Sequence, residues 1–568
     1  MRYLALASDY DGTLAHDGVV DDDTIHALER LIHSGRKLIL VTGRELPELE
    51  SVFPRIDLCE RVVAENGAVL YNPATREKRT LAERPPESFF DNLRRRGVKD
   101  LSVGDVIAAT WHPYEEQVLE AIRDEGLELQ IVFNKDAVMV LPSGTNKMSG
   151  LRCALEELKL SPHNVVGVGD AENDHIFLEG CECAVAVENA IPALKEKADF
   201  VTQNPRGAGV TELIEKLIQN DASDIGSKLT RRATLIGKSQ AGSVILPAYG
   251  CNVLVCGQSG SGKSTVVTGL LERIMEQNYQ LCLIDPEGDY ENLPGTRTVG
   301  DEKRAPSIEH VKQVLTEPDA QIVVHLTGVP IGDRHVIFAS LIAEIQKQRL
   351  ETGRPHWLVI DEAHHVLPDE WALTPAAMPE EVSNLILITV HPEHISPVAL
   401  RRINKVLVIG REPKMLLSEF AKVIETAAPE VEETDLPRGQ ALLWTIGKNE
   451  LELVKLEPPQ SEHYRHRRKY AEGQLEPERS FYFRGPGEKM DLRAQNLNTF
   501  VQIAEGIDAE TWLFHLKRGD YSNWIGHALN DESLADEIRA VEKDDSLPDQ
   551  ESRKRIRDAI LQKYTAPA

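Results

Sequence analysis

The chain has 568 residues, with 64 basic and 91 acidic side chains, a formal net charge of −27 and 41% hydrophobic residues. This length exceeds what one hydrophobic core supports and predicts several domains. The charge argues against a protein that binds nucleic acid over most of its surface, although a local basic groove is compatible with it.

No segment predicts a membrane anchor or an export signal. The apolar start at residues 3–7 is too short for a signal peptide, and no apolar run reaches the roughly 18 residues of a spanning helix. The seven cysteines are scattered without metal-ligand spacing, which favours buried thiols in a reducing compartment. We therefore expect a soluble cytoplasmic protein.

The first part of the chain places polar clusters after strand-like runs. Strand-like runs at 3–7, 37–41 and 164–169 each end just before a polar cluster. These clusters contain Asp9, Asp11, Thr42, Asp170 and Asp174. Lys147 instead follows an irregular segment. Open α/β sheets bind ligands at the carboxyl ends of their strands. We expect these side chains to form one site, although Asp9–Gly12 taken alone would also suit a turn, and Asp170 a helix cap.

These residue types suit phosphoryl transfer. Asp9 can act as a carboxylate nucleophile, and Asp11 can protonate the leaving alcohol and then activate water. Asp170 and Asp174 supply the oxygen ligands that Mg²⁺ prefers. Thr42 and Lys147 can hydrogen-bond to the transferred phosphoryl group and neutralise it.

With these motifs in view, residues 1 to about 215 resemble the haloacid dehalogenase (HAD) superfamily, in its Cof-like branch. The motifs that carry the resemblance are Asp9–Leu14, Thr42–Arg44, Glu65–Ala68, Lys147, Gly169–Asp174 and Ala186–Ala190. The resemblance implies a Rossmann-like α/β domain, an aspartyl-phosphate at Asp9, and Mg²⁺ held by Asp9, Asp170 and the backbone of Asp11. It also implies a phosphorylated small-molecule substrate, such as a sugar phosphate.

Residues 80 to about 142 leave room for a cap, whereas the span between Leu14 and Thr42 does not. Helix-like runs at 86–96 and 114–125 alternate with strand-like runs at 105–110, 127–133 and 137–141, so we predict a small α/β cap. Its basic run Arg94–Arg96 favours a solvated helix face over a substrate contact. Trp111 favours the cap core over a sugar pocket.

A second site begins at a glycine-rich turn between a predicted strand at 253–256 and a predicted helix at 264–277. The sequence G-Q-S-G-S-G-K-S fits a P-loop, in which backbone N–H groups cradle phosphates, Lys263 reaches the β/γ-phosphates and Ser264 holds Mg²⁺. The predicted ATP-binding residues are Gly257, Gln258, Ser259, Gly260, Ser261, Gly262, Lys263, Ser264 and Thr265.

The partner of this loop is the apolar run 357–360, which ends at Asp361 and Glu362. Asp361 is predicted to hold Mg²⁺ through water and Glu362 to activate the attacking water, as in a Walker B motif. Runs at 384–390, 405–409, 440–445 and 451–456 predict a large, mainly parallel sheet, and a hairpin is expected within 233–247.

Residues 233–458 resemble the HerA/FtsK branch of P-loop ATPases through the P-loop, Ile284–Tyr290 and Asp361–Glu362. The resemblance implies a ring-shaped homo-oligomer that moves DNA or polypeptide. Val390 occupies the position of the usual polar sensor, so Thr389 or His391 would have to replace it. Arg401 or Arg402 would be an arginine finger, or else part of a solvated helix face.

The remaining residues predict a small, mainly helical domain that resembles an uncharacterised bacterial domain. Its cluster Trp512–Trp524 favours core packing with a helix capped at Asp520 over a binding surface, and the basic run 463–470 favours a linker over a nucleic-acid contact. The predicted domains are 1–218, 233–458 and 480–568, with linkers at 219–232 and 459–479.

Three functions fit this organisation. The first is a bifunctional enzyme that joins a Mg²⁺-dependent phosphatase to an ATP-hydrolysing domain. The second is a DNA-processing ATPase with an accessory phosphatase, and the third is a phosphatase regulated by nucleotide binding. We favour the first in its general form.

Overall fold

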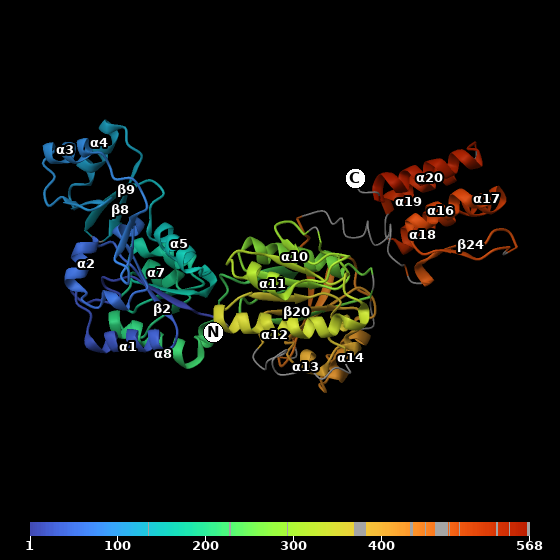
Figure 1. Ribbon diagram of the computed structural model, residues 1–568, viewed down its shortest axis with the longest axis horizontal. Helices are drawn as coiled ribbons and strands as arrows, with labels where there is room; N and C mark the ends of the chain where they lie inside the picture. The colour runs from blue at the N-terminus through green and yellow to red at the C-terminus, as the bar shows by residue number, and fades with distance from the viewer. Residues whose placement is uncertain are drawn as a thin grey trace. The chain divides into compact units, whose positions relative to one another are not determined.

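The structure is a computed structural model that describes residues 1–564 apart from 135, 227–228, 259, 292, 369–381, 432–434, 449, 461–474, 476, 488, 530–531 and 545. Residues 1–458 form one compact unit and residues 459–568 a second. The first unit contains two large sheets (Figure 1). We call residues 1–226 the N-terminal segment and residues 229–458 the central segment.

The N-terminal segment is built on an eight-stranded sheet. Its strands are β1 (Ala5–Ser8), β2 (Lys37–Val41), β3 (Arg61–Ala64), β4 (Val69–Asn72), β5 (Glu77–Thr80), β10 (Val165–Gly169), β11 (Cys183–Ala186) and β12 (Phe200–Val201). The spatial order is β12-β11-β10-β1-β2-β3-β4-β5, and only the β3–β4 and β4–β5 pairs are antiparallel. The predicted strands therefore lie side by side at the centre of a mainly parallel sheet.

Helices cover this sheet. They are α1 (Asp22–His33), α2 (Leu46–Val52), α5 (Lys147–Leu158), α6 (His175–Gly180), α7 (Pro192–Lys197), α8 (Arg206–Asn220) and α9 (Ser223–Gly226). α1 begins at Asp22 because the Asp21 side chain accepts a hydrogen bond of 2.7 Å from the N–H group of Thr24, which caps an otherwise unpaired donor. α1 and α8 pack against each other (Figure 1).

The predicted cap is present. It consists of α3 (Glu87–Arg95), α4 (Glu115–Glu125), β6 (Ser102–Val103), β7 (Ala108–Trp111), β8 (Leu129–Asn134) and β9 (Ala137–Pro142). The strands form an antiparallel sheet in the order β6-β7-β9-β8. Phe89, Phe90 and Leu93 of α3 are fully buried and build a separate core beneath the helices.

Two interpretations of the cap have different outcomes. Arg94 and Arg96 form ion pairs with acidic side chains of α3 and α4, as expected for a solvated helix face. Trp111 is 55% exposed, so its expected core position is wrong. It is the last residue of β7.

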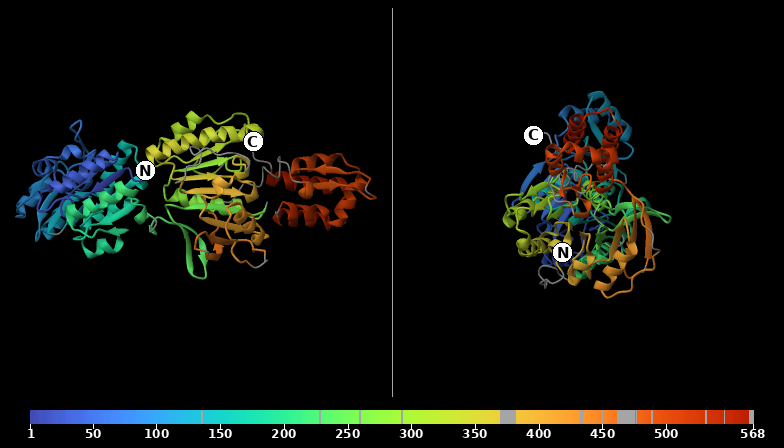
Figure 2. Two further views of the ribbon diagram at one scale, coloured as in Figure 1. Left: turned by 90° about the horizontal axis from the view of Figure 1, so that it is seen from below. Right: turned by 90° about the vertical axis from the view of Figure 1, so that its right-hand side faces the viewer.

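The central segment contains an eleven-stranded sheet. Its strands are β13 (Thr234–Ser239), β14 (Gly242–Leu246), β15 (Asn252–Cys256), β16 (Leu281–Asp285), β17 (Arg297–Val299), β18 (Ile322–His325), β19 (Trp357–Ile360), β20 (Leu385–Thr389), β21 (Lys405–Ile409), β22 (Gln440–Thr445) and β23 (Glu450–Leu456). The order is β14-β13-β23-β22-β21-β15-β20-β19-β16-β18-β17. The strands from β21 to β17 are parallel, and those from β22 to β14 are antiparallel, with the expected hairpin β13–β14 at the edge (Figure 2).

The helices of this segment are α10 (Lys263–Glu276), α11 (Ile308–Leu315), α12 (Arg334–Thr352), α13 (Pro397–Leu400) and α14 (Pro413–Val423). α10 and α12 lie on opposite sides of β20 (Figure 1). Alternate residues of β15 and β16 belong to two different core clusters, one under α10 and the other under α11, α12 and α14. The continuous apolar runs of these strands follow from this burial on both faces.

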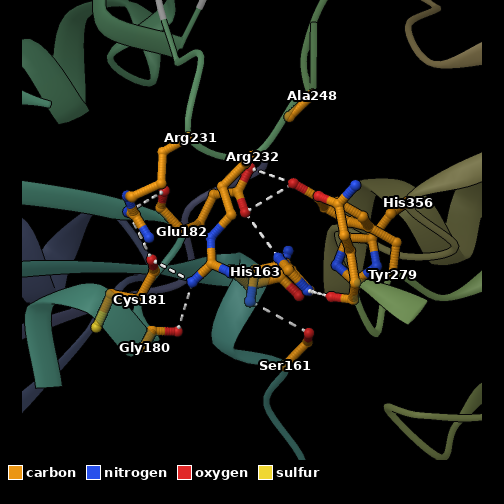
Figure 3. Close-up of polar contacts among 12 residues, drawn as sticks. Ser161, His163, Gly180, Cys181, Glu182, Arg231, Arg232, Ala248, Tyr279 and His356 are labelled. Carbon is orange, nitrogen blue, oxygen red and sulfur yellow. Dashed lines mark hydrogen bonds and ion pairs between the residues drawn. The ribbon is translucent and has the colours of Figure 1, made fainter. Parts of the chain in front are cut away.

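The two segments of the first unit meet around the buried carboxylate of Glu182 (Figure 3). Arg2 and His163 of the N-terminal segment bind this carboxylate, the latter through Nδ1 at 2.7 Å. From the central segment, the Tyr279 hydroxyl donates to it at 3.0 Å. His163 Nε2 donates to the carbonyl oxygen of Gln277 at 2.7 Å.

Residues of the predicted first linker pack on the N-terminal segment. Ala222, Ile225 and Leu229 are buried in its core. Arg231 donates to the carbonyl oxygen of Glu179 at 2.8 Å and to that of Cys181 at 3.0 Å. These carbonyl groups lie where α6 ends, and helix ends lack partners within the helix. Figure 3 shows the contact of Arg231 with Cys181. The described residues of this stretch are therefore packed against the N-terminal segment.

The second unit is mainly helical, as predicted. It contains the short antiparallel pair β24 (Phe481–Phe483) and β25 (Leu492–Ala494), and the helices α16 (Leu497–Gly506), α17 (Ala509–Arg518), α18 (Asp520–Ala528), α19 (Glu532–Glu542) and α20 (Asp549–Tyr564). Trp512, His515 and Tyr521 are buried in its core. The basic run 463–470 lies outside the described residues.

The expected cap at Asp520 is wrong. Asp520 is the first residue of α18, and Gly519 precedes it with φ 68° as the N-cap residue. The carboxylate of Glu542 accepts the first-turn N–H groups of Tyr521 and Ser522 at 3.1 and 3.0 Å. The carboxylate of Asp520 instead binds His515 Nδ1 at 2.8 Å. Because glycine tolerates positive φ, the chain turns directly from α17 into α18 at Gly519 and leaves no extended cap residue.

In the described part of the chain, no helix combines the length and the apolar character that crossing a bilayer requires. Of the seven cysteines, all but Cys153 are buried, and none is in a disulfide.

Candidate functional site

The polar residues predicted in the N-terminal segment converge at one edge of its sheet. β1 lies between β10 and β2, and all three strands are parallel. Asp9, Thr42 and Asp170 directly follow these three strands, so their side chains lie at the same carboxyl edge. All three are at most 5% exposed.

Lys147 joins the carboxylates of this cluster. Its Nζ lies 2.6 Å from Asp9 Oδ1 and 2.6 Å from Asp174 Oδ1. Lys147 is the first residue of α5, whose start is fixed by a capping box between Asn146 and Ser149. The helix N-terminus therefore holds the ammonium group in a position that is only 2% exposed.

The charges of this cluster shift each other's pKa values. Burial and the neighbouring carboxylate of Asp174 raise the pKa of Asp9 to about 8, against the opposing effect of Lys147. Burial alone would lower the pKa of Lys147, but the carboxylates of Asp174 and Asp9 outweigh it and raise the pKa. One lysine thus incompletely neutralises three buried carboxylates.

The same cluster fits a divalent cation. Oxygen atoms of Asp9, Asp170 and Asp174 all lie within 4.8 Å of one another, and carboxylates are the ligands that Mg²⁺ prefers. Asp174 is also held by its Oδ2, which accepts the N–H groups of Asp170 and Ala171 at 2.9 Å each. A Cβ atom at Gly12 would lie 2.4 Å from Asp170 Oδ2, so only glycine fits beside this carboxylate.

Asp11 is outside this group of three carboxylates, and Arg44 holds its side chain. The sequence motifs predicted no role for Arg44. Arg44 donates from Nε and Nη2 to the two carboxylate oxygens of Asp11, at 2.6 and 2.7 Å. This paired geometry fixes the orientation of the carboxylate. Arg44 directly follows Thr42 and Gly43, so its place in the motif was a signal for a role near the site. Thr42 Oγ1 accepts the N–H group of Arg44 at 3.1 Å.

Glu65 attaches the cap to the edge of the site. Its buried carboxylate accepts the N–H groups of Asp105, Val106 and Ile107, each at 2.9 Å. A Cβ atom at Gly104 would lie 2.6 Å from Glu65 Oε1, so the cap backbone approaches this carboxylate closely. Nothing in the local sequence around residues 104–107 indicates this contact, because it joins segments that are far apart in the chain.

The central segment forms the predicted loop between β15 and α10. Gly260 and Gly262 have φ values of 78° and 96°, which favour glycine. Lys263 Nζ donates to the carbonyl oxygens of Gly257 and Gln258 at 2.8 and 3.1 Å. Ser264 and Thr265 lie in the first turn of α10, and Ser261 lies in the loop before it. Ser259 is outside the described residues.

The predicted Walker B residues follow β19, one strand away from the loop strand. Asp361 is 1% exposed, and Glu362 has φ 40°, an uncommon conformation for a residue with a side chain. β20 lies between β15 and β19 and ends at Thr389. The hydroxyl of Thr389 lies 3.1 Å from His364 Nδ1, which links the strand end to the turn after Glu362.

The candidate sensor position and the candidate arginine finger differ in their surroundings. Val390 follows Thr389 and carries no polar group at the sensor position, whereas the buried Thr389 contacts the Walker B turn. Arg401 is exposed and pairs with Glu425 at 3.0 Å, as expected for a solvated helix face.

Comparison with known proteins agrees with this division. Residues 6–103 and 98–214 match the family model of the haloacid dehalogenase-like hydrolases. The phosphoglycolate phosphatase of Methanothermobacter thermautotrophicus is 32% identical over 222 residues, which span 98% of that protein and 38% of this chain. The chain belongs to the haloacid dehalogenase-like hydrolases.

Other relatives of this hydrolase cover the same share of the chain. Phosphoglycolate phosphatase 2 of Saccharolobus solfataricus is 28% identical over 228 residues, 94% of that protein and 38% of this chain. A solved haloacid dehalogenase-like hydrolase from Bacteroides thetaiotaomicron is 19% identical, spans 38% of this chain and 99% of its own, and has a TM-score of 0.33.

The central segment of the hydrolase has a relative of another kind. Residues 252–345 match the family model of the central domain of the helicase HerA. This match includes the predicted P-loop and ends before Asp361, so it does not cover the acidic pair after β19.

Proposed function

We propose that this chain carries two hydrolytic sites, a phosphomonoester phosphatase centred on Asp9 and an ATPase centred on Lys263. The observation that carries the first is the position of Lys147 Nζ, 2.6 Å from both Asp9 and Asp174. When Asp9 takes up a phosphoryl group, negative charge is added beside it, and the ammonium group of Lys147 is positioned to stabilise this charge.

In the proposed reaction, a carboxylate oxygen of Asp9 attacks phosphorus and the bond from phosphorus to the ester oxygen breaks. Asp11 gives its proton to the leaving oxygen. Water then attacks phosphorus, Asp11 accepts the proton of that water, and the bond between Asp9 and phosphorus breaks. Thr42 and Lys147 bind the phosphoryl oxygens in both steps, and Arg44 orients Asp11.

Mg²⁺ is the proposed cofactor of this site, with Asp9, Asp170, Asp174 and the backbone of Asp11 as its ligands. When bound, it neutralises charge on the carboxylates and on the phosphoryl group. The buried excess of negative charge around Asp9 supports this assignment.

The substrate is proposed to be a small phosphorylated acid or alcohol that fits beneath the cap. The names of the relatives favour 2-phosphoglycolate, and sugar phosphates are the alternative. Steady-state hydrolysis of 2-phosphoglycolate and of hexose phosphates tests this choice, and we expect a higher kcat/KM for the former. Acid quenching during turnover should trap phosphate on the peptide that contains Asp9, and the absence of such a species would contradict the mechanism.

For the central segment, we propose that the loop from Gly257 to Thr265 binds the phosphates of ATP. Lys263 would contact the β/γ-phosphates, while Ser264 and Asp361 would hold a second Mg²⁺. Glu362 would orient the attacking water. The likeness to HerA and the side-by-side arrangement of β15, β20 and β19 support this assignment.

The HerA likeness also favours a second candidate function for this segment, the movement of DNA by a ring of subunits. ATPase rates with and without duplex DNA, together with the mass of the particle in solution, test it. Stimulation by DNA in a hexamer-sized particle would support translocation. A slow, DNA-indifferent ATPase in a small particle would instead favour a nucleotide-regulated phosphatase.

A further inference from the structure

A group of metal-binding side chains lies just beyond strand β20, on a short turn that neither proposed site uses. Its members are His391, Glu393 and His394, and the last two belong to the 3-10 turn Pro392–His394. One ligand atom from each of the three residues lies within 4.8 Å of the other two.

Two of the separations between these atoms are close to the edges of a metal coordination shell. His391 Nδ1 and Glu393 Oε1 are 3.0 Å apart, and His394 Nε2 lies 3.6 Å from the same oxygen. With metal–ligand bonds of about 2.1 Å, neighbouring ligands are about 3.0 Å apart at right angles and about 3.4 Å apart at the tetrahedral angle. The three side chains thus need little movement to bind one ion.

The backbone holds this turn in place. The N–H group of His391 donates to Thr389 Oγ1 at 3.0 Å, and Ile395 after the turn is completely buried. Pro392 fixes φ at the first position of the turn. The histidine side chains themselves are 51% and 60% exposed, so an ion can reach them from solvent.

The second carboxylate oxygen of Glu393 is buried. Among the described residues, no N–H or O–H group donates to the buried Glu393 Oε2. A buried carboxylate oxygen of this kind favours a bound cation.

We propose that His391, Glu393 and His394 bind a divalent transition-metal ion of the Zn²⁺ class. Two imidazole nitrogens and one carboxylate select such ions over Mg²⁺ and Ca²⁺, which prefer oxygen ligands. Three protein ligands leave at least one position of the shell open to water or another ligand. Through Thr389, the turn is connected to His364 and hence to the Walker B turn, but metal binding itself does not depend on ATPase activity.

Equilibrium dialysis of the full-length, chelator-treated protein against Zn²⁺ in excess Mg²⁺ tests this site. Mg²⁺ occupies oxygen-only sites and leaves imidazole sites available. We expect His391→Ala and His394→Ala to bind one equivalent of Zn²⁺ less than the parent. Glu393→Gln should bind at least about tenfold more weakly, which is the low end of the loss seen when a supporting partner of a metal ligand is removed.

His310→Ala is the matched control, because His310 is an exposed histidine on α11, distant in sequence from the turn. It should retain the stoichiometry of the parent. Co²⁺ should also give visible ligand-field absorption in the parent and in His310→Ala, and lose it in His394→Ala. Circular dichroism without metal checks that the variants are folded. Equal Zn²⁺ stoichiometry in the parent and both histidine variants, or no binding by the parent, would overturn the proposal.

Discussion

The rings of His163 and Tyr279 stack with their centroids 3.8 Å apart, and both side chains bind the carboxylate of Glu182 (Figure 3). His163 belongs to the N-terminal segment and Tyr279 to the central segment. Burial would raise the pKa of Glu182, but the charge of Arg2 and the hydrogen bond from His163 outweigh it and lower the pKa to about 2. One buried anion therefore holds groups from both segments.

Replacing this anion should destabilise the first unit. Glu182→Gln leaves Arg2 and His163 without a negative partner, and breaking a buried pair in this way costs about 3–5 kcal/mol. Urea unfolding followed by tryptophan fluorescence should show a lower midpoint. Glu188→Gln removes an exposed carboxylate beyond the other end of β11 and should stay within about 0.5 kcal/mol of the parent. Equal midpoints for the two variants would contradict the role of Glu182.

The same interface predicts a loss of stability in acid. Burial and the neighbouring His163 hold the pKa of His356 well below 6.5. Its Nδ1 accepts the N–H group of Gln280 at 2.8 Å. The unfolded chain therefore takes up a proton on this histidine below about pH 6.5 while the folded chain does not, so stability falls as the pH falls. Glu182 adds a second loss between about pH 4.5 and pH 2, where its unfolded form binds a proton first.

Urea midpoints measured between about pH 7 and pH 5 test the contribution of His356, over the range where a free histidine titrates. His356→Gln keeps an acceptor for the Gln280 N–H group and should flatten the pH dependence. His310→Gln should leave it as in the parent. An unchanged slope in His356→Gln would show that this ring does not contribute.

Most of the candidate site in the N-terminal segment could be predicted, because several of its residues directly follow a predicted strand. Asp9, Thr42 and Asp170 each follow an apolar run that predicts a strand. Parallel strands bring their carboxyl ends together at one edge of the sheet. The contacts of Glu65 with residues 105–107 could not be predicted, because they depend on how the cap folds back on the sheet. The same holds for Glu182, whose partners come from distant parts of the chain.

Predictions from local sequence were wrong where one sequence pattern fits two different local structures. Asp520 resembles a helix cap, but the flexible Gly519 takes that position. Trp111 is a large apolar residue, yet at the last position of β7 its side chain is exposed. The spacing of His391, Glu393 and His394 is visible in the sequence, yet only the short turn after β20 brings their ligand atoms together.

Arg44 should affect phosphatase turnover through Asp11. Arg44→Gln removes both hydrogen bonds that orient the carboxylate, and misplacement of a catalytic group costs up to about 10²-fold in rate. We expect kcat to fall by about 10- to 100-fold with a smaller change in KM, and Arg44→Lys to recover part of the loss. ATP hydrolysis by the same variant is the internal control. A parent-like kcat in Arg44→Gln would exclude this positioning role.

Glu65 should control the attachment of the cap. Glu65→Gln replaces an acceptor-only carboxylate by an amide that cannot accept all three N–H groups, and each buried donor left unpaired costs about 1–3 kcal/mol. Hydrogen exchange at the amides of Asp105–Ile107 should become faster. Glu83→Gln, at an exposed position before the cap, should leave the exchange unchanged. Equally slow exchange in both variants would argue against this anchor.

The central claim, two separate hydrolytic sites in one chain, is tested most directly by paired assays of aryl-phosphate and ATP hydrolysis on the parent, Asp9→Asn and Lys263→Ala. The account predicts that Asp9→Asn loses phosphatase activity and retains ATPase activity, while Lys263→Ala loses only ATPase activity. Retained phosphatase turnover in Asp9→Asn would contradict the assignment of the nucleophile. Retained ATPase turnover in Lys263→Ala would contradict the second site.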